Sequence, residues 1–187
     1  MKTDYVYKNE LLHVLAALTP ANRLVCEISL VTGLRVGDVL KLRTEALRGI
    51  LESKSKQKRL TVVEQKTGKS RRVYFPTELL ERVIAQAGPE WAFNGRLDDK
   101  HHRTRQAVYK DLKRASRLFR IKLNISPHSC RKIYAVNLYR RTGDLEKVRE
   151  TLQHSQEAIT MLYAMADVLT ARKLGISVEQ LDEKFRG

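Results

Sequence analysis

A single β-branched segment, in a chain that otherwise has helical periodicity, limits the fold more than any other feature. Residues 59–66 and 72–75 are rich in valine, threonine and aromatic residues, a composition typical of strands. The polar stretch 67–70 between them, Thr-Gly-Lys-Ser, is typical of a turn, so the two strands should form a β-hairpin. We expect residues 49–52 to add a third strand. The sequence therefore predicts a mixed α+β fold, mainly α-helical, with one small antiparallel three-stranded sheet.

Apolar residues recur at helical spacing on both sides of this hairpin. Ser126 is the expected N-cap of a helix that begins at Pro127, and Gly33 and Gly143 are the expected C-caps of two helices. Residues 89–102 have no regular pattern. The helical segments that we predict cover residues 11–18, 22–31, 36–43, 77–86, 103–120, 127–141 and 144–153.

The charge of the chain indicates what kind of partner it binds. Thirty-six lysines and arginines against 21 acidic residues leave a formal net charge of +15 and a pI of about 10 in 187 residues. A surplus of this size suits a polyanion, above all a nucleic acid. The alternative is a basic protein whose charges only keep it in solution.

Several classes of protein are disfavoured by the sequence. The two cysteines, Cys26 and Cys130, lie in apolar or helical stretches and form neither a disulfide framework nor a zinc-binding pattern. Residues 1–9 are polar and charged, unlike a signal peptide, and no apolar run approaches the ~20 residues needed to cross a membrane. We therefore expect one cytoplasmic domain with no metal, no cofactor and no membrane contact.

Two pairs of residues have chemistry that suits a phosphate group. His128 and Arg131 are three apart in a predicted helix and share a face, so an imidazole that moves a proton lies beside a guanidinium that binds two oxygens. Arg35 follows the helix-ending Gly33 and can point into a cleft, where Asp38 would orient it through a bidentate bond. Taken alone, the first pair is more often a solvated surface pair and the second an ordinary helix corner.

Three further residues are individually weak candidates. Lys66, at the hairpin tip, can reach into a groove and neutralise a phosphate or deliver a proton, although a polar turn is the commoner explanation. His154 and Tyr163 are nine residues apart. Most tyrosines are half-buried packing residues with a hydrogen-bonded hydroxyl, so this pair means little by itself.

The order of these motifs changes the interpretation. From Thr32-Gly33-Leu34-Arg35 through His128-x-x-Arg131 to Leu152-x-His154 and Tyr163, the chain resembles the catalytic domain of tyrosine recombinases of the phage integrase family. Lys66 falls between the first two motifs, where that family keeps a lysine. The resemblance extends from about residue 11 to residue 163. It implies the tyrosine recombinase catalytic-domain fold, double-stranded DNA as the partner, and site-specific cleavage and rejoining of that DNA.

The resemblance implies a nucleophile and a set of phosphate ligands. Tyr163 would attack a DNA phosphodiester and form a 3′-phosphotyrosyl bond. Arg35 and Arg131 would clamp the phosphate, where two permanently charged forks suit the negative charge of the transition state, and His154 would donate a further hydrogen bond. Because the protein–DNA bond stores the energy of the broken one, resealing would need neither ATP nor metal.

Proton transfer is assigned in the same way. A phenol has a pKa near 10, so the tyrosine needs help to attack at neutral pH. By resemblance, His128 would handle the tyrosine proton and Lys66 would protonate the departing 5′-oxygen. Asp38 matches the acidic position that supports the first motif.

We expect DNA contacts from the hairpin and from the basic helix 103–120, with weak, salt-sensitive binding because phosphate contacts give affinity without reading sequence. The basic residues are spread around the helix, so some of them will be solvated. The residues that we predict to bind DNA are Lys69, Arg103, Arg105, Lys110, Lys113, Arg114 and Arg117.

The segment 164–187 forms a C-terminal tail. Ser177 and Gln180 fit a capping box, and Val178, Leu181 and Phe185 then form one apolar stripe. This helix either packs on its own domain or, as is common in the family, docks on a neighbouring protomer. The second interpretation predicts a homo-oligomer, a tetramer, on DNA.

The chain departs from the family at two places and leaves two rivals. Gln153 replaces a glycine that is usual before the histidine of His154, and the N-terminal DNA-clamping domain that usually precedes this one is expected to be absent, in a fragment or a naturally short protein. A type IB topoisomerase shares the arginine, lysine and tyrosine set, but the His154 motif and the apolar tail favour a recombinase. A non-catalytic DNA-binding regulator is disfavoured because no member of the set is missing.

Overall fold

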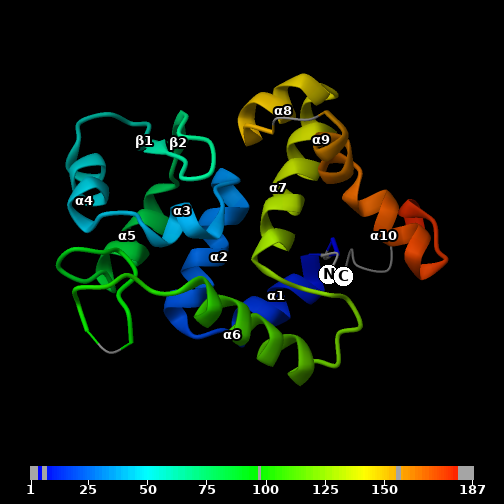
Figure 1. Ribbon diagram of the computed structural model, residues 1–187, viewed down its shortest axis with the longest axis horizontal. Helices are drawn as coiled ribbons and strands as arrows, with labels where there is room; N and C mark the ends of the chain where they lie inside the picture. Colours follow the sequence, from blue (N-terminus) through cyan, green and yellow to red (C-terminus); the bar gives the residue numbers. More distant parts are fainter. Residues whose placement is uncertain (1–3, 6–7, 97, 155–156, 181–187) are drawn as a thin grey trace.

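Two long helices packed against each other, α2 (Pro20–Thr32) and α7 (Pro127–Thr142), lie at the centre of the molecule (Figure 1). The computed structural model describes residues 4–5, 8–96, 98–154 and 157–180. Leu24, Val25 and Ile28 of α2 are buried in the main core, and each such side chain stabilises the fold by about 1.5–3 kcal/mol. This packing fixes the ends of α2 and α7 relative to each other.

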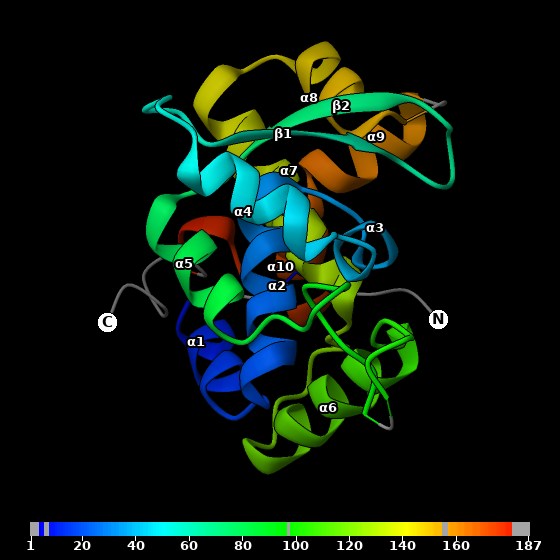
Figure 2. The same ribbon diagram turned by 90° about the vertical axis from the view of Figure 1, so that its left-hand side faces the viewer.

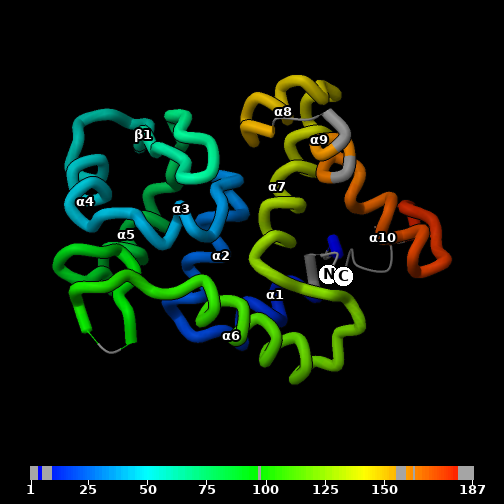
Figure 3. Tube along the Cα trace, in the orientation of Figure 1, coloured from blue at the N-terminus to red at the C-terminus, as the bar shows by residue number. Residues whose placement is uncertain are grey.

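The other elements surround this pair in two groups. The helices besides α2 and α7 are α1 (Lys8–Ala16), α3 (Val36–Leu40), α4 (Thr44–Glu52), α5 (Thr77–Ala85), α6 (Arg105–Leu118), α8 (Leu145–Leu152), α9 (Glu157–Ala164) and α10 (Ala166–Leu174). One group, with α4, α5 and the hairpin, lies on the α2 side, and the other, with α8, α9 and α10, lies along α7 (Figures 1 and 3).

The sheet is smaller than the sequence predicts. In the described part of the chain it has two antiparallel strands, β1 (Arg59–Val63) and β2 (Ser70–Tyr74), paired from Arg59 with Tyr74 to Val63 with Ser70. The prediction of a third strand at residues 49–52 was wrong, because these residues complete α4. Ile50 and Leu51 pack with the buried Leu47 as one helical face, and so short an apolar run does not distinguish helix from strand.

The predicted helix ends are confirmed. Gly33 and Gly143 close α2 and α7 in the left-handed region, at φ 67° and 66°. A Cβ on Gly33 would also lie 2.5 Å from Cδ1 of Tyr134, so both backbone and packing require glycine there. The Ser126 side chain accepts from the backbone N–H of His128 and takes part in a capping box with Ser129.

The tail begins as part of the domain. The Thr170 hydroxyl of α10 accepts from the backbone N–H of Tyr5 at 3.1 Å, and Arg140 of α7 pairs with Asp167 at 2.6 Å. Ser177 and Gln180 form the reciprocal bonds of a capping box, at 2.9 and 3.1 Å. The predicted stripe residues Leu181 and Phe185 lie outside the described residues. Within the described ranges, no helix combines the length and hydropathy required to cross a membrane.

Candidate active site

Arg131 ties together three motifs that are far apart in the sequence. It is 2% exposed, and its two terminal nitrogens donate to the backbone carbonyls of Gly33 and Leu152. These carbonyls lie at the C-terminal ends of α2 and α8, where helices have unpaired acceptors and partial negative charge. Burial, and then the neighbouring Arg35, lower the pKa of Arg131 to about 10, so it is cationic at neutral pH.

Arg35 is held by a residue that the sequence analysis missed. It stands at the N-cap of α3, and its guanidinium pairs with Glu64, whose side chain is fully buried. Arg71 of β2 approaches the same carboxylate at 3.4 Å and donates to the carbonyl of Thr32 at 2.9 Å. Glu64 follows Val62 by two residues and shares its inward face, a pattern that predicts a buried carboxylate in need of a cation.

Asp38 has a different partner from the one that we expected. Its carboxylate accepts from the backbone N–H of Gln65 at 3.0 Å, in the loop between the two strands. Arg35 pairs with Glu64 instead, so the expectation of a bidentate Asp38–Arg35 bond was wrong. Glu64 approaches Arg35 from the hairpin, a contact between distant segments that sequence spacing does not reveal.

Tyr163 and His154 lie in contact beside Arg131. Their rings are 4.8 Å apart between centroids in an edge-to-face arrangement, and Nδ1 of His154 lies 3.2 Å from the Thr160 hydroxyl. The ammonium of Lys132 lies 5.8 Å from the centre of the Tyr163 ring. His154 is buried whereas Tyr163 is half-buried, so the tyrosine ring is accessible from the cavity that it lines.

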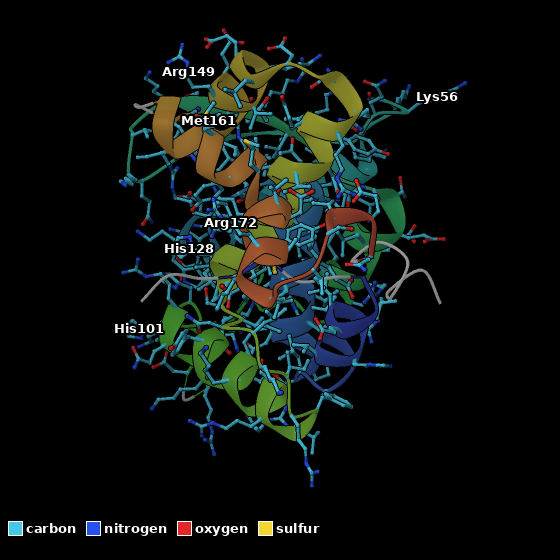
Figure 4. All side chains as sticks on the ribbon, turned by 90° about the vertical axis from the view of Figure 1, so that its right-hand side faces the viewer. Lys56, His101, His128, Arg149, Met161 and Arg172 are labelled. Carbon is cyan, nitrogen blue, oxygen red and sulfur yellow. The ribbon has the colours of Figure 1, made fainter. Side chains whose placement is uncertain are left out.

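His128 and Lys66 stand at the open side of the site. His128, in the first turn of α7, is exposed, as Figure 4 shows, and Lys66 is exposed in the hairpin loop. Partial desolvation of the imidazole, followed by the charges of Arg131 and Arg35, lowers the pKa of His128. The imidazole is therefore neutral at neutral pH and able to accept a proton.

One cavity of about 1010 Å³ brings these side chains together, and we call it the cationic pocket. It lies between the hairpin loop, the start of α3, the N-terminus of α7 and α9. In Figure 2 the hairpin turn lies at the right of the view, on the same side of the molecule as α3 and α9. Its charged lining favours an anion such as a phosphate. Among the residues that line it are all seven that the sequence analysis singled out, Arg35, Asp38, Lys66, His128, Arg131, His154 and Tyr163.

The basic residues that we predicted to bind DNA are divided by the structure. Arg105 lines the cationic pocket. Arg103, just before α6, donates to the side chain of Asn22 at 2.6 Å, and Arg114 of α6 donates to the backbone carbonyl of Ala17, so both connect this part of the chain to the α1–α2 region. Lys113 donates to the side chain of Asn124. Lys69, Lys110 and Arg117 are exposed. No group of three or more His, Cys, Asp or Glu side chains suited to a metal ion occurs among the described residues.

Burial of His154 predicts a pH-dependent stability. Desolvation, then Arg131 and Arg35, lower the pKa of His154 to about 4 from an unfolded value of about 6.5. The unfolded chain thus binds more protons between these values, so the stability present above about pH 6.5 is lost as the pH falls toward 4. Between about pH 7 and about pH 5 we expect the protein to lose about 1–2 kcal/mol more than a His154→Asn variant. Urea unfolding of both proteins measures this, and equal losses would contradict the assigned burial effect.

Comparison with known proteins places this geometry in a family. The family model described as Phage integrase family matches residues 4–169. The chain belongs to the phage integrase family. Tyrosine recombinase XerD of Lacticaseibacillus casei is 29% identical over 147 residues, covering 76% of this chain and 49% of XerD. The integrase of Escherichia phage P2 is 26% identical over 163 residues, covering 87% of this chain and 43% of that protein.

Solved structures of recombinases have the same fold as this phage integrase family chain. The XerH site-specific recombinase bound to difH in a post-cleavage complex superposes with a TM-score of 0.69 and 18% identity, over 91% of this chain and 51% of that one. The catalytic domain of bacteriophage HP1 integrase gives a TM-score of 0.63 and 21% identity, over 92% and 95%. The chain spans about half the length of the XerD and XerH proteins that it matches.

Proposed function

We propose that this chain is the catalytic domain of a site-specific DNA recombinase that cleaves and rejoins DNA through a covalent 3′-phosphotyrosyl intermediate. The observation that carries the proposal is the convergence of Tyr163 with two arginines, two histidines and a lysine on the cationic pocket. These residues come from the start of α3, from α7, from the end of α8, from α9 and from the hairpin loop. Their order along the chain is the order of the motifs in the family. The family match covers residues 4–169 and includes every one of them.

The proposed reaction exchanges one phosphodiester for another. The hydroxyl oxygen of Tyr163 attacks phosphorus, its proton passes to His128, and the bond from phosphorus to the 5′-oxygen breaks. The ammonium of Lys66 gives that oxygen a proton. Rejoining reverses these steps when a 5′-hydroxyl attacks the phosphotyrosine, so atoms and charge balance without any other reactant.

The two arginines stabilise the transition state. Arg35 and Arg131 are oriented before substrate arrives, the first by Glu64 and the second by the carbonyls of Gly33 and Leu152. Preorganised cations aimed at the non-bridging oxygens cost no reorganisation when charge develops there. Neutral His154 adds an N–H donor, and we place the phosphate between these three groups.

The experiment that tests the proposal looks for a covalent adduct. The protein is mixed with nicked duplexes drawn from the DNA that flanks its gene, in a chelator, and resolved by denaturing electrophoresis. We expect a protein–DNA band, since no step requires a metal. Absence of the band on DNA that the protein binds would favour a DNA-binding regulator. An adduct accompanied by relaxation of supercoiled DNA by the monomer would favour a topoisomerase.

The assembly that we propose on DNA is a tetramer coupled by the tail. The face formed by α9 and α10 exposes Met161, labelled in Figure 4, together with Met165 and Leu169, apolar side chains suited to a protein contact. Residues 181–187 include Leu181 and Phe185 of the apolar stripe predicted from the sequence. Deletion of this segment should weaken assembly on DNA and strand exchange, while the melting temperature stays within a few degrees of the original. Native electrophoresis and thermal unfolding measure both, and unchanged assembly would refute the coupling.

A further inference from the structure

Gln153 has a backbone conformation that its residue type disfavours. It caps the C-terminus of α8 at φ 50° and ψ 46°, in the left-handed region. Among the described residues, the other non-glycine residue with positive φ is Arg120, at 52°. A residue with a Cβ is strained in this region, whereas a glycine is not. The strained residue lines the cationic pocket, and strain at such a place motivates a search for what its side chain does.

The side chain of Gln153 reaches the loop that carries Lys66. Its Oε1 accepts from the hydroxyl of Thr67 at 2.6 Å, and its Nε2 lies 3.5 Å from the carbonyl oxygen of Ser70. Thr67 is the residue directly after Lys66. On the other side of Lys66, Asp38 accepts from the backbone N–H of Gln65 at 3.0 Å. Lys66 therefore sits between two residues that are each anchored to a different helix.

These anchors matter because the lysine itself has none. In the described part of the chain no side chain forms a hydrogen bond or ion pair with the ammonium of Lys66, which is exposed. The reach of a flexible lysine into a cavity is then set by where its backbone is held. Beyond the strand pairing, which stops at Val63 and Ser70, the turn is closed by its own backbone bonds from Glu64 to Lys69 and from Gly68 to Glu64. These bonds shape the turn, whereas the bonds from Asp38 and Gln153 connect it to the helices.

We propose that Gln153 is a positioning residue, which holds the loop of Lys66 against the end of α8 so that the lysine ammonium stays at the cationic pocket. The effect on cleavage rests on the proposed function, but the clamp itself is a property of the free protein. A glycine at this position would relieve the backbone and release the loop at the same time. Stability and loop order should thus change in opposite directions, which a purely structural residue would not produce.

The clamp is tested without DNA by hydrogen exchange of the amides of residues 65–69. In Gln153→Gly, and also in Thr67→Val, these amides should exchange about five- to tenfold faster, because both variants lose the hydrogen bond between the two side chains. In Thr67→Val the Lys69 amide also loses its own acceptor, so that amide is left out of the comparison. The melting temperature of Gln153→Gly should be unchanged or higher. Arg120→Gly is the matched control, since it relieves the same backbone conformation far from the loop and should leave exchange at 65–69 unchanged. Unaltered exchange in Gln153→Gly would overturn the proposal.

The link to Lys66 is tested with a modified substrate. A duplex that the unmodified protein cleaves is compared with the same duplex carrying sulfur in place of the bridging 5′-oxygen, whose thiolate leaves without a proton. Gln153→Gly should form the adduct roughly tenfold more slowly on the oxygen substrate, a part of the 10²–10⁴-fold that general acids supply. It should match the unmodified protein within about twofold on the sulfur substrate.

The outcomes separate the two proposals. An equal defect on both substrates would show that Gln153 does not act through Lys66, and would overturn its assignment as a positioning residue. A protein that forms no adduct on any DNA refutes the proposed function, while the exchange data still decide whether Gln153 holds the loop.

Discussion

The Tyr163→Phe variant should form no covalent adduct with any DNA that the unmodified protein cleaves. Phenylalanine keeps the ring that packs edge to face on His154 but lacks the oxygen that would attack phosphorus. DNA binding should persist within a few-fold, because the cations of the cationic pocket are untouched. The melting temperature should change by no more than a few degrees, since one half-buried hydroxyl is lost.

Adduct formation and DNA binding must both be measured to interpret the Tyr163→Phe variant. Denaturing electrophoresis after incubation with a nicked duplex detects the adduct, and a filter or mobility assay on the same DNA at a stated salt concentration measures binding. Tyr109→Phe is the matched control, because this exposed tyrosine also lines the cationic pocket but has no assigned role. An adduct that survives in Tyr163→Phe would mean that another residue is the nucleophile.

Much of the candidate site could be predicted because its motifs are local. His128 and Arg131 share a helical face by spacing alone, and the helix start at Ser126–Pro127 follows from capping. Gly33 predicts the end of α2, and Arg35 follows two residues later, at the start of α3. Such patterns depend only on a few neighbouring residues, so they can be recognised without knowledge of the rest of the fold.

The parts that failed depend on contacts between distant segments. Nothing near Arg35 in the sequence indicates that Glu64, from the hairpin, is its partner, and Asp38 at the favourable local spacing bonds the loop instead. Arg103 and Arg114 are predicted to bind DNA from charge alone, and that prediction stands, but charge does not reveal that they also bond Asn22 and the carbonyl of Ala17. Charge and periodicity identify a basic residue, whereas its partner is chosen by tertiary packing.

Two arginines that bridge the C-terminal ends of α2 and α8 explain why the positions of the site residues depend on the fold. Arg131 donates to the carbonyls of Gly33 and Leu152, and Arg71 donates to those of Thr32 and Thr151. Both side chains thus join the C-terminus of α2 to that of α8, each satisfying acceptors that the helices leave unpaired. The motif of Arg35 and the motif of His154 begin directly after these two ends. Their relative position is therefore set by the arginines that bridge them.

Replacement of Arg131 should accordingly cost stability as well as chemistry. Arg131→Ala leaves two buried carbonyls without donors and the buried Glu64 with less positive charge nearby, so we expect a loss of about 3–5 kcal/mol in the free energy of unfolding. Arg131→Lys keeps a charge but cannot span both carbonyls, and a loss of about 1–3 kcal/mol is expected. Urea unfolding of the three proteins gives both numbers.

The lysine variant separates the two roles of Arg131, because it should remain folded. We expect its adduct formation to fall about a hundredfold or more, since an ammonium cannot hold two phosphate oxygens in a fixed plane while it bonds the helix ends. Arg71→Lys is the matched comparison, because Arg71 bridges the same two helix ends from β2 but does not line the cationic pocket. A similar loss of stability with a much smaller loss of cleavage in Arg71→Lys would assign the excess to contact with the phosphate. Equal losses of cleavage in both variants would mean that Arg131 acts only by holding α2 and α8 together.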